Sequence, residues 1–146
     1  MNILFPATSP TALIVILVCL NGCVQRENLY PVRGRVEFED GTPVKSGTVE
    51  FRLPERQKVA RGKISADGMF SLSTFALEDG ALAGKHQVIV AQTILYDSAD
   101  QHQHSKGLRL VHPVYASYDT TPLEVVVHAD GPNNRVNVVV SKTPPD

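Results

Sequence analysis

One polar stretch of this 146-residue sequence contains side chains suited to binding a metal ion. His102 and His104 offer imidazole nitrogens, and Asp97 and Asp100 lie nearby with carboxylate oxygens. Both groups are common ligands of transition metals. Two histidines at positions i and i+2 of a flexible segment lack the preorganised third and fourth ligands of a zinc site. We therefore interpret residues 95–111 as a solvated polar loop and predict no metal site.

A second group consists of two tyrosines and two histidines: Tyr115, Tyr118, His112 and His128. Iron-dependent ring-cleaving dioxygenases use the same four ligand types on a related sandwich fold, but the spacing here does not match that family. Tyrosines beside a strand are more often half-buried packing residues with the hydroxyl at the surface than metal ligands. The sequence also lacks a Gly-x-Ser-x-Gly elbow, a His-Glu-x-x-His helix and a phosphate-cradling glycine loop. We predict no catalytic residues, no cofactor and no enzyme activity.

The third chemically notable residue is Cys23, which follows an apolar run of about ten residues, Thr11 to Leu20. A helix needs about twenty residues to cross a bilayer, so this run is short for a membrane span and typical of an export signal. Cys19 lies inside the run and is expected to leave with it. Cys23 would then have no partner for an intramolecular disulfide.

The four residues Leu20-Asn21-Gly22-Cys23 resemble the bacterial lipobox. The resemblance implies cleavage between Gly22 and Cys23 and thioether lipidation of Cys23, with a membrane as partner and a location on the exported side of the cell envelope. Two features depart from the family: Asn21 is larger and more polar than usual, and no Lys or Arg precedes the apolar run. An ordinary secretory signal and an uncleaved short anchor remain as alternatives.

We accordingly expect a signal peptide over 1–22, a lipidated tether over 23–30 and one domain over 31–146. The last segment is long enough to bury one core. The formal net charge is -1, and basic residues alternate with glutamates along 33–52. Nucleic-acid binding requires a clustered basic excess, so we predict no nucleic-acid partner.

The domain has the hydrophobic period of β-strands. Val32 and Val36 share one face of a strand whose other face carries charged side chains, and Asp40-Gly41-Thr42-Pro43 then ends it. Asp67-Gly68 indicates a hairpin. No window after Cys23 has the period of a capped helix. We predict an all-β fold, a sandwich of about seven antiparallel strands. The expected strands lie at 32–39, 48–53, 59–64, 69–73, 86–91, 123–127 and 136–140.

The turn glycines and inward apolar positions form a recognisable series. It consists of Val32-x-Gly34-x-Val36, Asp40-Gly41-x-Pro43-Val44, Gly47-x-Val49-x-Phe51, Asp67-Gly68-x-Phe70 and Gly84-x-x-x-Val88, followed by Pro113, Tyr115, Thr120 and Thr121. The series resembles the carboxypeptidase regulatory-like domain, a transthyretin-like (prealbumin-like) sandwich, and in particular short bacterial lipoproteins built from one such domain. His86 departs from it, because relatives tend to have an aromatic residue there. The motifs imply a fold and no chemistry.

The function expected from these observations is that of a membrane-anchored, non-catalytic binding or structural module. Candidate partners are an envelope protein, since edge strands can pair through backbone groups alone, or a polysaccharide. An accessory carbohydrate-binding role is an alternative, although the chain has no Trp and only Tyr96, Tyr115 or Tyr118 for stacking on sugars. The third candidate function is that of a metal-dependent enzyme on a transthyretin-like fold.

Overall fold

In the computed structural model, residues 27–92, 110–130 and 134–143 are described. Within them the regular backbone consists of nine β-strands and two short 3-10 helices, with no α-helix, so the prediction of an all-β protein is confirmed. Seven strands coincide with the predicted runs, and two strands of two residues each are additional. The strands are β1 (Leu29–Tyr30), β2 (Val32–Phe38), β3 (Gly47–Leu53), β4 (Lys58–Ile64), β5 (Met69–Ser71), β6 (Ala81–Leu82), β7 (Gly84–Ala91), β8 (Glu124–Val127) and β9 (Asn134–Val140), and the 3-10 helices are η1 (Pro54–Arg56) and η2 (Pro113–Ala116).

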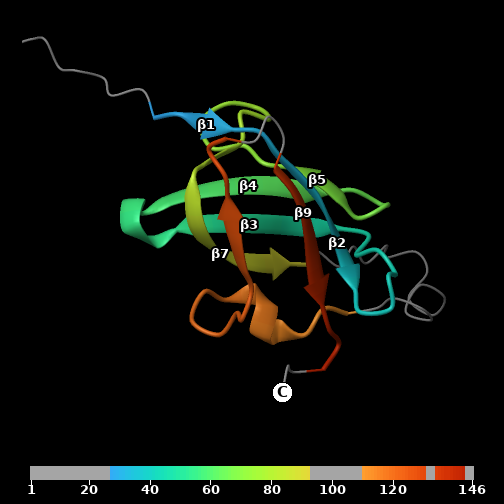
Figure 1. Cartoon of the computed structure of the whole chain (residues 1–146). Coiled ribbons are helices and arrows are strands. Elements are labelled where there is room, and N and C mark those ends of the chain that lie inside the picture. Colours follow the sequence, from blue (N-terminus) through green and yellow to red (C-terminus); the bar gives the residue numbers. More distant parts are fainter. Residues whose placement is uncertain (1–26, 93–109, 131–133, 144–146) are drawn as a thin grey trace, which may run out of the picture.

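The two larger sheets face each other across one hydrophobic core (Figure 1). One sheet has the strand order β4-β3-β7-β8 and the other β5-β2-β9, while β1 and β6 form a small separate pair. Alternate residues of β2 and β3 are buried, as the period of two predicts. The rings of Phe51 and Phe70, one from each sheet, lie 6.0 Å apart between centroids.

One strand pairing differs from the predicted wholly antiparallel arrangement. Strands β2 and β9 lie side by side in Figure 1 and run parallel, in register from Val32 opposite Asn134 to Phe38 opposite Val140. The expectation was wrong for this pair because β2 and β9 are far apart in sequence, so no tight turn determines their relative direction. Gly34 lies at this pairing, where an added Cβ would come within 2.2 Å of the Val136 carbonyl oxygen.

The turn at Asp67-Gly68 forms, but it does not join a regular hairpin. Gly68 has φ +83°, and its N–H donates to the Ser65 carbonyl. Strand β4 before the turn pairs with β3, whereas β5 after it pairs with β2 in the opposite sheet. The turn therefore carries the chain from one sheet to the other. That crossing places Phe70 in the core opposite Phe51.

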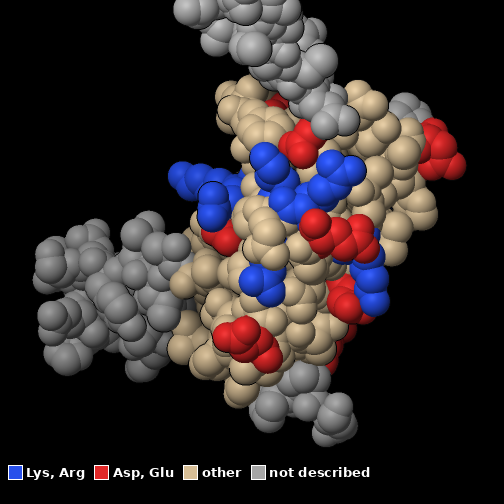
Figure 2. Space-filling model, turned by 90° about the vertical axis from the view of Figure 1, so that its left-hand side faces the viewer, with Lys and Arg blue, Asp and Glu red and all other residues tan. Residues whose placement is uncertain are grey.

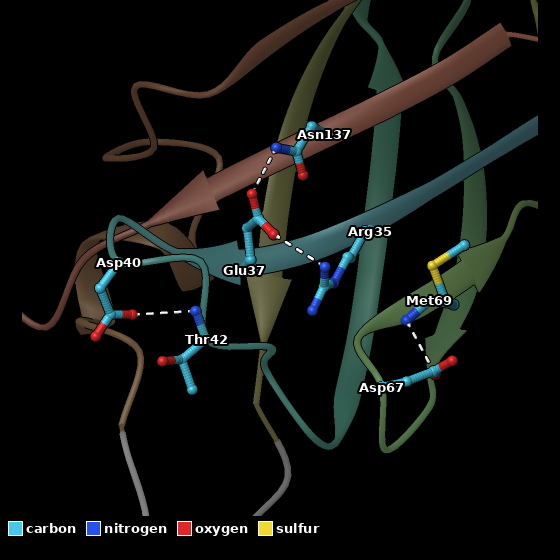
Figure 3. Close-up of polar contacts among 7 residues, drawn as sticks. All are labelled: Arg35, Glu37, Asp40, Thr42, Asp67, Met69 and Asn137. Carbon is cyan, nitrogen blue, oxygen red and sulfur yellow. Dashed lines mark hydrogen bonds and ion pairs between the residues drawn. The ribbon is translucent and has the colours of Figure 1, made fainter.

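Figure 3 shows polar contacts on the outer face of the three-stranded sheet and at two turns beside it. Glu37 accepts a 2.7 Å hydrogen bond from the Asn137 amide and lies 3.5 Å from Arg35. At two turns, Asp40 and Asp67 each accept from the backbone N–H two residues further along the chain. Such short-range bonds favour turn conformations. On this face, Glu37 thus connects side chains of β2 and β9.

The strand pairing reaches further toward the N-terminus than the expected domain start at Pro31. Leu29 and Tyr30, which we expected in a tether without strand structure, pair as β1 with β6. Gly80 permits this close approach: it has φ +94°, and an added Cβ would lie 2.0 Å from the Tyr30 carbonyl oxygen. The described fold therefore includes residues that come only a few positions after the predicted lipidation site.

Candidate functional site

Several predicted site residues lie outside the described residues. They are Gly22 and Cys23 of the lipobox-like segment, Asp97, Asp100, His102 and His104 of the polar loop, and Tyr96. Lipidation of Cys23 therefore stays a prediction. The interpretation of residues 95–111 as a solvated polar loop without a metal site stays one too. The described part of the chain does contain the tyrosines and histidines of the second group, and it contains the end of the domain that follows Cys23.

The second group is spread over different parts of the fold. Tyr115 is buried in the core, whereas Tyr118 lies half-buried over the outer face of the four-stranded sheet. The His112 Nδ1 accepts a hydrogen bond from the Val114 N–H and so caps η2. His128 follows β8. Across the described residues, no group of three or more His, Cys, Asp or Glu side chains is placed to hold a metal ion.

Tyr118 belongs to a polar cluster on the outer face of the four-stranded sheet. Glu50 of β3 accepts a 2.7 Å hydrogen bond from Arg61 of β4 and a 3.1 Å bond from the Tyr118 hydroxyl. The Arg52 guanidinium lies 3.9 Å from the centre of the Tyr118 ring and donates a 2.6 Å hydrogen bond to Gln87 of β7. The cluster thus joins three strands to the segment that follows η2.

The electrostatics of this cluster favour a neutral tyrosine. Burial raises the pKa of Tyr118 well above its usual value, and the adjacent Glu50 carboxylate raises it further. The positive charges of Arg52 and Arg61 act in the opposite direction but do not outweigh these effects. The phenol therefore remains protonated at neutral pH and serves as a hydrogen-bond donor, which suits a structural role better than that of a base or nucleophile.

His86 is buried in the core. Its ring lies 6.0 Å from the Phe51 ring between centroids. The Nε2 atom is 2.9 Å from the Leu82 carbonyl oxygen, a distance at which a proton on Nε2 makes a hydrogen bond. The buried Nδ1 has no hydrogen-bond partner among the described residues. The His86 ring therefore packs in the core against Phe51, as an aromatic side chain would.

A shallow groove runs along the seam between the edges of β4 and β5. It carries three basic side chains, Arg33, Arg61 and Lys63. Two of them already have carboxylate partners: Arg61 is bonded to Glu50, and Arg33 lies 3.4 Å from Glu78. Their positive charge is largely balanced, so the groove gives little support to an anion site.

The end of the domain that receives the chain from Cys23 has a different character. Glu27 lies between two basic residues, 3.9 Å from Arg56 and 3.6 Å from Lys58. The Lys58 ammonium is also 5.0 Å from the centre of the Phe75 ring. Phe75 and Leu77 are largely exposed on the loop between β5 and β6. We call Glu27, Arg56, Lys58, Phe75 and Leu77 the N-terminal end cluster.

Asp79 holds the loop of this cluster in shape. Its Oδ1 accepts a 2.6 Å hydrogen bond from the Thr74 N–H, and its Oδ2 accepts from the N–H groups of Phe75 and Ala76 at 2.9 and 2.7 Å. Burial opposes ionisation of the carboxyl, but these three donors outweigh it and lower the pKa of Asp79. The charged carboxylate thus organises the loop from within.

The comparisons with known proteins identify no family. No protein-family model matches the sequence, and no curated protein matches it. The likeness to carboxypeptidase regulatory-like domains therefore remains a resemblance of motifs. Within the described part of the chain, no helix combines the length and apolar character needed to cross a membrane.

Sequence reasoning did not single out either cluster. The sequence predicted the strands that contain Glu50 and Arg61, and the structure places both side chains on the outer face. Nothing local indicated that Tyr118 would fold over them. Phe75 and Leu77 were not predicted to be special, although two large apolar residues in one turn are a detectable signal.

Proposed function

We propose that the protein is an exported lipoprotein whose body is a non-catalytic binding or structural module. Lipid on Cys23 would hold it at a membrane on the exported side of the cell envelope. We further propose that the body is a transthyretin-like sandwich of the carboxypeptidase regulatory-like type. The burial of the motif positions Val36, Val49, Phe51 and Phe70 supports that fold.

The observation that carries the proposal is the position of Cys23. It follows Leu20-Asn21-Gly22 directly and comes four residues before Glu27, whose carboxylate is in contact with Arg56 and Lys58. A chain spans at most about 3.5 Å per residue, so the Cα atoms of Cys23 and Glu27 lie within about 14 Å of each other. Acyl chains on Cys23 would therefore keep the whole domain close to the membrane.

Three features support a non-catalytic role. The environment of Tyr118 keeps its phenol neutral, Tyr115 is buried in the core, and His112 is occupied in capping η2. The carbohydrate-binding alternative gains no comparable support, because the face of Tyr118 is covered by Arg52. We therefore place the binding or structural module first.

Fractionation of cells that produce Cys23→Ala tests the anchor. We expect the native protein in the membrane fraction and the variant in the soluble exported fraction, because Cys23 is the proposed acceptor of the lipid. Cys19→Ala is the matched control, since it removes the other cysteine and should leave the protein membrane-bound. Intact mass measurement completes the test. An unmodified Cys23 in the native protein, or a leader still attached, would contradict the proposal.

A further inference from the structure

The loop between β5 and β6 presents two apolar side chains to solvent. Phe75 is 63% exposed and Leu77 is 91% exposed, which makes them the two most exposed large hydrophobic residues in the described ranges. They lie two positions apart on one loop. Two exposed apolar residues of this size on one loop mark an interaction surface more often than a single scattered one does.

The loop is preorganised. Three backbone N–H groups at residues 74–76 donate to the Asp79 carboxylate, and the Glu78 N–H donates to the Ser73 hydroxyl at 2.8 Å. The Thr74 hydroxyl donates a further 2.6 Å bond to the Gly80 carbonyl. A loop already held in one shape loses little conformational entropy when its side chains are buried against a partner.

The position of the loop indicates what that partner is. Strand β6, which follows the loop, pairs with β1, so the loop ends beside the strand that comes first in the described fold (Figure 1). Lys58 connects the two, since its ammonium contacts both Glu27 and the Phe75 ring. An anchored Cys23, within about 14 Å of Glu27, brings this end of the domain to the bilayer.

Electrostatic attraction to anionic lipid does not account for a contact between this loop and a bilayer. Basic side chains near the loop are paired with acidic ones: Arg33 with Glu78, and both Arg56 and Lys58 with Glu27. Figure 2 likewise shows basic side chains gathered on the flank of the molecule with acidic side chains directly beside them. A balanced set of charges suits zwitterionic headgroups and gives no selectivity for anionic lipid. Contact would depend on burial of the apolar side chains.

We propose that Phe75 and Leu77 insert into the interface of the phospholipid bilayer that holds the lipid on Cys23. This inference rests on the proposed lipidation. Two side chains alone bind a bilayer weakly, but the anchor makes their insertion an intramolecular step at high effective concentration. Lys58 can place its ammonium at headgroup level while its stem follows the Phe75 ring inward. The two contacts together orient the domain on the membrane.

The test measures how close each end of the domain lies to the lipid. The membrane-attached protein carries Ala76→Cys, labelled with a fluorophore, in vesicles of zwitterionic lipid that contain nitroxide-labelled phospholipid. Ala76 is exposed between Phe75 and Leu77. Glu39→Cys is the matched control, because Glu39 is exposed just beyond the opposite end of β2. The unsubstituted chain is the blank, since a lipidated Cys23 takes no label.

We expect the nitroxide lipid to quench the fluorescence of the label at residue 76 and to leave the fluorescence at residue 39 unchanged. Replacing both Phe75 and Leu77 with Ser should abolish the quenching at residue 76 while the protein stays in the membrane fraction. Equal quenching at residues 76 and 39, with lipid on Cys23 established by mass, would overturn this inference alone. A bare Cys23 would remove the proposed function, and the inference with it.

Discussion

The Tyr118 hydroxyl donates a 3.1 Å hydrogen bond to the Glu50 carboxylate, although the two residues lie 68 positions apart in the chain. Glu50 is in the middle of β3, and Tyr118 comes from the segment between η2 and β8. The bond therefore fastens a stretch without strand structure to the centre of the four-stranded sheet. The Thr121 hydroxyl adds a second attachment, a 2.6 Å bond to the Val88 carbonyl of β7.

Tyr118→Phe removes this hydrogen bond and leaves the ring under Arg52. We expect the free energy of unfolding to fall by about 1 kcal/mol, since the bond involves a charged acceptor at a half-buried site. Urea denaturation of the native and variant proteins measures the difference. A double-mutant cycle with Glu50→Ala should give a coupling energy of about 0.5 kcal/mol or more. Strictly additive losses would show that the two side chains do not interact.

The same tyrosine predicts the stability of the protein in alkali. Burial and the Glu50 carboxylate raise the pKa of Tyr118 in the folded state above its ordinary value of 10.0. The unfolded chain therefore loses this proton at a lower pH than the folded chain does, and stability falls as the pH rises above about 10. Tyr118→Phe should show a shallower fall between about pH 9 and pH 11. Parallel pH curves for the two proteins would be the contrary result.

Gly34 tests the parallel pairing of β2 and β9. An added Cβ would lie 2.2 Å from the Val136 carbonyl oxygen and 2.6 Å from the Phe70 ring. We expect Gly34→Ala to cost about 3 kcal/mol or more, because backbone and core must both move. Gly41→Ala is the matched control: Gly41 has φ +79° but open space around it, so we expect about 1 kcal/mol. Thermal unfolding compares the two, and similar losses would contradict the observed packing.

The parts of this fold that depend on neighbouring residues could be predicted from the sequence. Alternation in β2 and the turn at Asp67-Gly68 follow from local hydrophobic period and from glycine φ. The parallel partner of β2, the transfer of β5 to the opposite sheet and the docking of Tyr118 on Glu50 depend on long-range contacts that no local pattern encodes. The lipobox-like segment is also a local pattern, so lipidation of Cys23 is a prediction that the sequence alone allows.

Asp79 provides the final prediction, because its charged carboxylate accepts three backbone hydrogen bonds within the loop that presents Phe75 and Leu77. In Asp79→Asn the amide nitrogen replaces one acceptor oxygen and faces N–H donors. We expect the free energy of unfolding at neutral pH to fall by about 1–2 kcal/mol. Asp130→Asn, which alters an exposed carboxylate, should have little effect.

The difference between the native protein and Asp79→Asn should also depend on pH. Since the folded-state pKa of Asp79 is lowered from 3.8, the stabilisation by its carboxylate is fully present above about pH 4 and is lost as the pH falls through the folded-state pKa. The two denaturation free energies should therefore converge in acid. A gap of the same size at neutral and acidic pH would show that the loop depends on the shape of the Asp79 side chain and not on its charge.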